Sequence, residues 1–280
     1  MDAEDHFGAL ASVWDAQAEA MNAAMGAHAD AARRALAAAS GENIADLGCG
    51  PGLSAVALGA EVGPTGWIAA IDIVPQMAQA AGRRMATAGV PGTSAAADVA
   101  TADLPSFGAE GRPFDAVHSR FGLMFFPQPG PAFANIASAM RPGARLAASV
   151  WQPIDRNPWM ALTTVTAMGV LGITPQPSHP GGPGPFSLGD PDSTARLFSE
   201  AGFADVRFDA IEAPFVFEGD GFAAAERILG AGPVGGAFLA ADANRRREVV
   251  EAVVGALADH RSAQGYAVPA ASWCITAWRG

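Results

Sequence analysis

Short apolar runs alternate with amphipathic stretches through the first half of the chain. Runs rich in Ile, Val, Ala and Leu predict buried strands at residues 43–47, 67–71, 93–97, 114–119 and 144–151. The stretches between them space their apolar side chains as helices do, and they predict helices at residues 53–60, 75–88 and 131–140. Because strands and helices take turns along the chain, the pattern predicts a mostly parallel α/β sheet with helices on both faces.

Both flanks of this alternating region are predicted to be mainly helical. Residues 8–39 carry two successive helical stripes. Beyond residue 151 Pro and Gly become frequent, and segment 175–191 is a candidate lid because residues 179–186 fit neither helix nor strand. The rest of this flank predicts helices at 158–171, 190–201, 222–229, 234–241 and 245–260, and strands at 206–211 and 272–278.

Composition and charge narrow the chemistry. All 17 basic residues are arginine, so neither a lysine Schiff base nor a lysine-bearing phosphate loop is available. The net charge is −11 and the arginines are scattered, which argues against nucleic acid as a partner. The two cysteines, Cys49 and Cys274, and the dispersed histidines lack metal-ligand spacing, so we expect no metal. The sequence has no membrane-spanning apolar run and no secretory signal at its start, so we expect a cytoplasmic protein.

A glycine-rich turn after the first predicted strand is the most informative motif. Residues 44–52 have the sequence I-A-D-L-G-C-G-P-G and join that strand to a helix. Gly48, Gly50 and Gly52 let the backbone approach a ligand closely, and the N–H groups that begin the helix suit an anion. The motif therefore predicts a ligand site at the carboxyl end of the strand.

Acidic residues near this turn indicate what the ligand is. The dinucleotide fingerprint G-x-G-x-x-G requires glycine where this chain has Leu53. Asp46 would repel a pyrophosphate but can face an ammonium group. Asp72 and Asp98 end the second and third predicted strands. Asp72 can accept hydrogen bonds from ribose hydroxyls, whereas Asp98 and the Val99 N–H can hold an adenine. An adenosyl ligand with both an ammonium and a carboxylate fits this set better than a dinucleotide.

Residues 44–151 resemble the class I S-adenosylmethionine-dependent methyltransferases, and especially the group similar to ubiquinone and menaquinone biosynthesis methyltransferases. The matching motifs are I-A-D-L-G-C-G-P-G (44–52), A-A-I-D (69–72), A-A-D-V (96–99), F-D-A-V-H-S-R-F-G-L-M-F-F (114–126) and R-P-G-A-R-L (141–146). In the last of these, Ala144 replaces a glycine that is usual in the family. The resemblance is faint over the N-terminal helices and over residues 152–262, where such enzymes differ by substrate.

This resemblance implies a Rossmann-like, seven-stranded sheet with a helical cap, forming one domain over residues 1–280. We expect N-terminal helices at 1–42, a cofactor-binding core at 43–151, a substrate cap with the sixth strand at 152–262 and the last strand at 263–280. The implied cofactor is S-adenosylmethionine, with S-adenosylhomocysteine as product. The residues expected to bind it are Asp46, Gly48, Cys49, Gly50, Gly52, Asp72, Ile73, Met77, Asp98, Val99, Ser119 and Trp14.

The expected reaction is methyl transfer to an O, C or N atom of a small, largely apolar or aromatic molecule. His118 and Arg120 are the candidate catalytic residues, since both belong to the fourth strand or follow it. Each also has a plainer interpretation, His118 as a core histidine and Arg120 as the partner of an acid. Further aromatic side chains are expected to line the acceptor pocket, namely Phe121, Phe125, Phe126, Trp151, Trp159 and Phe186.

Two other functions stay open from the sequence alone. A nicotinamide-dependent oxidoreductase would use the same strand and turn, although Asp46 and Leu53 argue against it. A protein that keeps the cofactor pocket without transferring methyl groups has the same motifs. Assembly as a homodimer is equally open.

Overall fold

A mixed sheet forms the centre of the molecule, which we describe from a computed structural model for residues 3–174 and 182–280. Its strands follow the order β3-β2-β1-β4-β5-β8-β6, with β7 paired to β8 alone. The strands β1 to β5 are parallel to one another, and β8 runs antiparallel to both β5 and β6. Their bounds are β1 Asn43–Leu47, β2 Trp67–Asp72, β3 Gly92–Ala96, β4 Phe114–Arg120, β5 Met140–Trp151, β6 Phe203–Glu218, β7 Arg261–Ser262 and β8 Gly265–Arg279. The predicted class, a mostly parallel Rossmann-like sheet, is confirmed.

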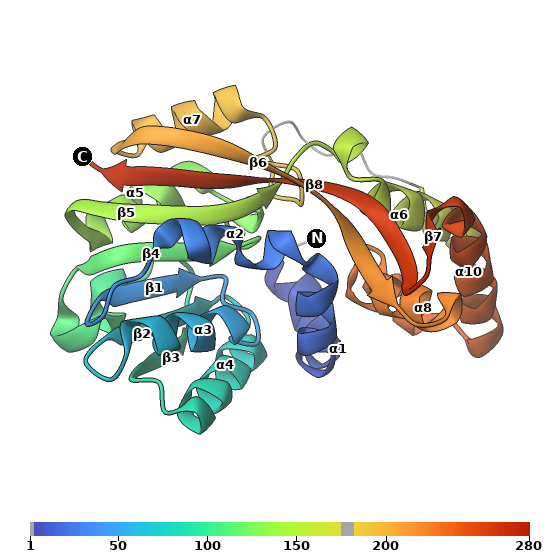
Figure 1. The fold of residues 1–280 in the computed structure, drawn as a ribbon, viewed down its shortest axis with the longest axis horizontal. Helices are drawn as coiled ribbons and strands as arrows, with labels where there is room; N and C mark the ends of the chain where they lie inside the picture. The colour runs from blue at the N-terminus through green and yellow to red at the C-terminus, as the bar shows by residue number, and fades with distance from the viewer. Residues whose placement is uncertain (1–2, 175–181) are drawn as a thin grey trace.

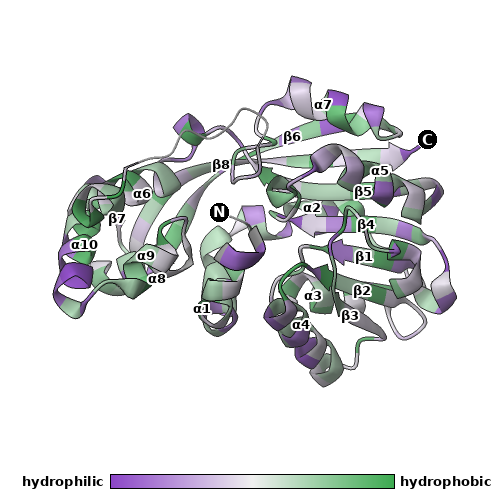
Figure 2. Ribbon diagram, turned by 180° about the vertical axis from the view of Figure 1, so that it is seen from behind, coloured by the Kyte–Doolittle hydropathy of each residue, from purple (hydrophilic) through white to green (hydrophobic). Residues whose placement is uncertain are grey.

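Helices cover both faces of this sheet. In Figure 1, α2 and α3 lie on the face turned toward the viewer, and the opposite view in Figure 2 brings α5 to the front. The helices are α1 Ala3–Met25, α2 Ala27–Leu36, α3 Leu53–Val62, α4 Pro75–Ala88, α5 Pro129–Ala139, α6 Pro158–Leu171, α7 Pro191–Glu200, α8 Gly221–Ala231, α9 Gly235–Ala240 and α10 Ala243–Ala256. The predicted helices 75–88 and 158–171 are confirmed with the same bounds.

Local signals explain where several helices begin. A proline stands in the first turn of α4, α5, α6 and α7, where no N–H is needed. The side chains of Asp190, Asp220 and Asp242 cap α7, α8 and α10 by accepting backbone N–H groups. Figure 2 shows hydrophilic residues gathered on outer helices such as α10, while the central strands are mostly hydrophobic.

The last two long strands differ most from the prediction. We expected strands at 206–211 and 272–278, but β6 has 16 residues and β8 has 15. They pair along their whole length, from Phe203 with Arg279 to Glu218 with Gly265. Figure 1 shows this two-stranded ribbon leaving the sheet and running out to α6, α8 and α10, which form a cap. In the ribbon Pro214 stands opposite Pro269, and such prolines argue against a strand when only the sequence is read.

Smaller differences concern the cap. The helix predicted at 245–260 ends at Ala256, because Leu257 leaves helical geometry and Ala258–His260 form a 3₁₀ turn. The two-residue strand β7 was not predicted. Residues 175–181 of the expected lid lie outside the described residues, whereas Gly184 and Ser187 are described and both donate hydrogen bonds to the Met124 carbonyl. No helix in the described part of the chain combines the length and apolarity needed to cross a membrane.

Candidate cofactor and acceptor site

A cavity of about 440 Å³ lies at the carboxyl ends of the parallel strands, beneath α1 and the cap. This is the edge at which open α/β sheets bind their ligands. Of the residues predicted for the site, those that line the cavity are Trp14, Gly48, Cys49, Gly50, Asp72, Ile73, Met77, Asp98, Val99 and Arg120. Four others, Asp46, Gly52, His118 and Ser119, are not part of its wall.

The glycine loop between β1 and α3 is shaped by two different demands. Gly48 and Gly52 have φ values of +63° and +90°, and a Cβ on either would lie 2.8 Å or less from backbone atoms of Gly122 or Ala81. These two glycines are therefore required by packing as well as by conformation. Gly50 also has a positive φ of +53°, yet no atom lies within 4 Å of the Cβ it lacks. Gly50 lines the cavity, and its backbone is open to a ligand there.

Asp72 joins the glycine loop to the end of β2. Its Oδ2 accepts the Gly50 N–H at 2.9 Å and its Oδ1 accepts the Val74 N–H at 2.9 Å. Burial raises the pKa of Asp72 above its ordinary value, although both hydrogen bonds act in the opposite direction. Because a carboxylate has about four lone-pair sites, Asp72 can still accept hydroxyl groups of a ligand.

Asp98 lines the cavity from the loop that follows β3. It is exposed, and its Oδ1 accepts the Ala100 N–H at 2.9 Å. The adjoining Val99 is buried, and its carbonyl accepts a hydrogen bond from Asn135 Nδ2 at 2.7 Å. The loop after β3 is thus fixed by polar contacts on both sides, while the Asp98 carboxylate stays accessible.

Three buried polar side chains next to the glycine loop, Asp46, Ser54 and His118, correct two predictions made from the sequence. Asp46 was expected to face an ammonium group, but it is fully buried and bonded to Ser54 Oγ at 2.9 Å and His118 Nδ1 at 2.8 Å. His118 is equally buried, and its Nε2 has no partner among the described residues. Neither side chain can touch a ligand in the cavity, so His118 has no geometric basis for a catalytic role. Ser119 likewise turns inward, donating to the Leu47 carbonyl at 2.7 Å.

Helix α1 crosses the cavity and closes it. Arg84 of α4 donates to the Pro51 carbonyl of the glycine loop at 3.0 Å and also pairs with Asp15 of α1. Trp14, one residue earlier, lines the cavity, and its indole Nε1 is buried with no partner among the described residues. The role of Trp14 beside a cofactor stays a prediction.

Arg120 is the cation of the cavity wall. Its Nη1 donates to Asn22 Oδ1 of α1, and no carboxylate in the described residues lies within ion-pair distance of it. Burial lowers the pKa of the guanidinium, while the charges of Asp46 and Asp30 act in the opposite direction. The interpretation of Arg120 as one member of an ion pair is therefore wrong.

Aromatic rings enclose the opposite half of the cavity. Phe121 stacks on Trp151 with ring centroids 4.0 Å apart, and Trp159 stacks on Phe215 at 4.4 Å. Phe121 has a positive φ of +58°, a strained conformation that occurs most often at functional sites. The sequence missed Phe215, because the predicted strand stopped at residue 211. Phe186, which it included, does not line the cavity.

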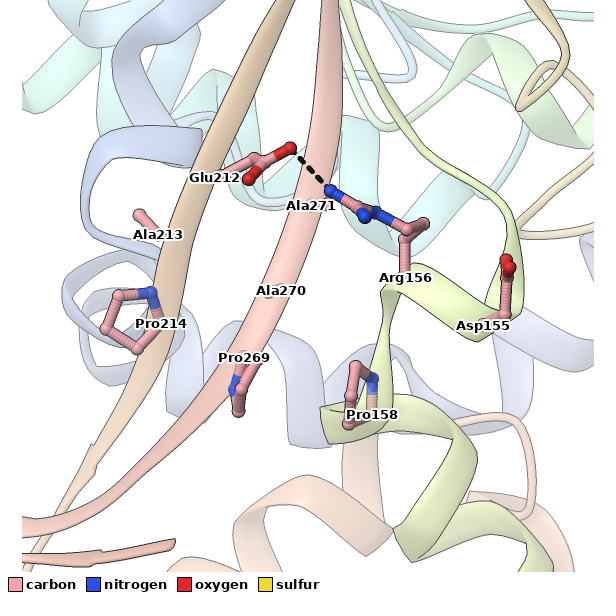
Figure 3. A pocket seen from close by; sticks show the side chains of 9 residues that line it. All are labelled: Asp155, Arg156, Pro158, Glu212, Ala213, Pro214, Pro269, Ala270 and Ala271. Carbon is pink, nitrogen blue, oxygen red and sulfur yellow. Dashed lines mark hydrogen bonds and ion pairs between the residues drawn. The ribbon is translucent and has the colours of Figure 1, made fainter.

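A second hollow of about 380 Å³ lies on the outside of the ribbon (Figure 3). Prolines and alanines of β6 and β8 form most of its wall, and Arg156 bonds to Glu212 across it at 2.5 Å. It has neither a glycine loop nor aromatic side chains, so we place the functional site in the first cavity.

Comparison with known proteins agrees with this placement. Residues 44–143 match a family model described as a methyltransferase domain. The chain is 32% identical over 108 residues to aklanonic acid methyltransferase DauC of Streptomyces sp. (strain C5). This match covers 39% of this chain and 47% of DauC. It is also 34% identical over 112 residues to an uncharacterized 37.1 kDa protein in transposon TN4556 of Streptomyces fradiae. This second match covers 40% of this chain and 31% of the transposon protein. Both matches therefore span less than half of the relative.

The fold is shared more widely than the sequence. The YcgJ protein from Bacillus subtilis superposes with a TM-score of 0.54 over 89% of this chain and 97% of its own, at 15% identity. The narrower likeness to ubiquinone and menaquinone methyltransferases stays a prediction. Residues 44–143 thus match a methyltransferase domain, and together with the fold this match supports the resemblance to class I S-adenosylmethionine-dependent methyltransferases.

Proposed function

We propose that this protein transfers a methyl group from S-adenosylmethionine to a small, largely aromatic molecule. The observation that carries the proposal is that one cavity contains both a glycine loop with strand-end acids and a set of stacked rings. The first half suits an adenosyl cofactor and the second half suits a flat apolar acceptor.

The residues present fit the cofactor. In this proposal Asp72 accepts the ribose hydroxyls, Asp98 and Val99 hold the adenine, and the open side of Gly50 receives the methionine part. Ile73 and Met77 pack beside the adenosine, and Trp14 covers it from α1. Cys49 contributes its backbone, because burial and the charges of Asp72 and Asp46 raise the pKa of its thiol well above the ordinary value.

Positioning is the main contribution of the chain to the reaction. When bound, S-adenosylmethionine supplies a methyl group already activated for direct displacement. Alignment of an acceptor atom with that group accounts for roughly 7–11 kcal/mol of barrier lowering. The stacked rings fix the plane of the acceptor, and α1 with the cap excludes water.

We also propose the corresponding division of the chain. Residues 43–151 bind the cofactor, and residues 1–42 close that site through α1. The cap within 152–262 and the strand within 263–280 complete the acceptor half. Phe215 of β6 and Trp159 of α6 support this division, because both reach the cavity from outside the cofactor core.

Calorimetric titration tests the proposal. The purified protein is titrated with S-adenosylmethionine, S-adenosylhomocysteine, NADH and NADPH. We expect micromolar binding of the adenosyl ligands alone, weakened at least tenfold in Asp72→Ala and unchanged in Asp259→Ala, which removes an exposed acid of the cap. Binding of a nicotinamide cofactor instead would overturn the proposal. Methyl transfer itself is then followed by mass spectrometry with a panel of aromatic acceptors.

A further inference from the structure

Arg120 is a half-buried cation that pairs with no carboxylate among the described residues. The guanidinium has five N–H donors, yet the only hydrogen bond it makes among the described residues is to the neutral side chain of Asn22. Partial burial of a charge without an opposite partner is costly, and an anionic ligand would offset that cost. Because Arg120 lines the cavity, its free donors can reach a ligand there.

The contacts of α1 show which half of the cavity the guanidinium occupies. The first half of this helix packs on the cofactor side, where Ala11 joins a cluster with Val74 and Met77. The second half, with Met21 and Met25, lines the cavity and packs into the large core cluster that contains Trp151 and Trp159 as well as Val99. Asn22 lies in this second half. It accepts a hydrogen bond from Arg120, and Phe121, which follows Arg120, stacks on Trp151, so the guanidinium stands beside the acceptor end of the cavity.

Among residues 3–174 and 182–280, no side chain at the acceptor end can remove a proton from an acceptor. Among the described residues that line the cavity, the ionisable ones are Cys49, Asp72, Asp98 and Arg120. The two acids stand on the cofactor side, and the raised pKa of Cys49 keeps its thiol protonated. These described residues offer no general base to an acceptor that must lose a proton, whereas an acceptor that is already ionised needs none.

We propose that the acceptor is a flat aryl carboxylate whose charge is bound by Arg120 between Asn22 and the aromatic rings. This inference rests on the proposed function. Arginine matches the geometry of a carboxylate with two parallel N–H groups, and the neighbouring rings of Trp151 and Trp159, tilted by 59° with centroids 5.2 Å apart, suit contact with an aromatic ring. Arg120 is therefore a specificity-determining residue of the acceptor site.

Matched acids and amides test the inference. With S-adenosylhomocysteine bound, the protein is titrated with benzoate, 2-naphthoate and anthracene-2-carboxylate, each beside its neutral carboxamide. We expect at least one acid to bind about tenfold more tightly than its amide, as a charged hydrogen bond provides. In Arg120→Gln this preference should disappear, and in Arg120→Lys part of it should return. Arg156→Gln, which removes an exposed arginine of the outer hollow, should keep the full preference.

Affinity for the cofactor product separates this inference from the proposed function. We expect Arg120→Gln to bind S-adenosylhomocysteine as tightly as the unaltered protein. A loss of that binding, with binding of 5′-methylthioadenosine retained, would mean that Arg120 holds the carboxylate of the cofactor, and it would overturn the inference alone. Equal binding of every acid and amide would overturn it as well. Failure of the unaltered protein to bind any adenosyl ligand would instead remove the proposed function and the inference together.

Discussion

The two ends of the cavity are built in different ways. The cofactor end is made largely of backbone, in the loop of residues 48–52, whose conformation depends on glycines and on Asp72. The acceptor end is made of large side chains from β4, β5, α6 and β6, which are distant in sequence. The first end is therefore rigid and local, whereas the second depends on how the cap is held. Three substitutions can break or sharpen this contrast.

The largest effect is expected at the cofactor end. In Gly52→Ala the new Cβ would lie 2.5 Å from Ala81 Cα, at a φ of +90°. Strain and overpacking together should lower the free energy of unfolding by about 2–5 kcal/mol, which denaturant titration measures. S-adenosylhomocysteine binding should weaken with it.

Gly50→Ala is the matched control for this change. Its Cβ meets no atom within 4 Å, so stability should fall by only about 1 kcal/mol, while affinity for the cofactor product falls because the methyl group enters the cavity. Equal stability of the two variants would show that the loop is not packed against α4.

A smaller loss of stability is expected at the acceptor end. Asn157 is fully buried, donates to the Gln152 carbonyl at 2.8 Å, and accepts the Ala271 N–H at 3.0 Å and Trp159 Nε1 at 3.2 Å. Asn157→Ala leaves these groups unpaired and should cost about 1–3 kcal/mol. Binding of S-adenosylhomocysteine should stay within about twofold, because the glycine loop is untouched.

The exposed Asn244→Ala serves as the control, and both its stability and its binding should be unchanged. If Asn157→Ala abolished cofactor binding instead, the structure of the cofactor end would depend on that of the acceptor end.

The smallest effect is a dependence on pH. His28 of α2 is bonded through Nδ1 to Ser272 Oγ at 2.7 Å and through Nε2 to the Ala213 carbonyl at 2.9 Å. The carbonyl requires a proton on Nε2, so Nδ1 accepts from the serine and the ring is neutral. Burial lowers the pKa of His28 below its ordinary value, although the bond to Ala213 acts in the opposite direction.

As the pH falls through about 6.5, the unfolded chain therefore takes up this proton before the native protein does. Stability should decrease over that window by up to about 1.4 kcal/mol per pH unit. Denaturation at pH 7.5 and 5.5 should show a smaller decrease in His28→Gln than in the unaltered protein. His260→Gln should behave as the unaltered protein does. If stability decreased equally with pH in His28→Gln and His260→Gln, His28 would not anchor α2 to β6 and β8.

The cofactor end could be predicted from the sequence because its signals are local. The glycines, the strand before them and Asp72 all lie within one β-α-β unit, and their spacing alone fixes their order in space. The direction in which a buried polar side chain points is different, since it depends on partners from other strands. Asp46 was therefore assigned to a ligand, when it faces Ser54 and His118.

The acceptor end could be predicted only in part. Trp151 and Trp159 were found because aromatic residues near strand ends are conspicuous. Phe215 was not found, because the ribbon that bears it contains Pro214 and many exposed positions. An antiparallel ribbon is held by its ladder of backbone bonds and needs no continuous apolar run, so composition does not reveal its length.

The ribbon also has a consequence for how new specificities arise. Residues 219–264, with α8, α9, α10 and β7, leave the ribbon of β6 and β8 after Glu218 and rejoin it at the residue opposite, Gly265. A recombination event at that one junction would exchange most of the cap as a unit, while the glycine loop and Arg120 are inherited unchanged. Such a graft alters the shape of the acceptor chamber in one step, and a protein engineer can use the same junction to transplant substrate range between relatives.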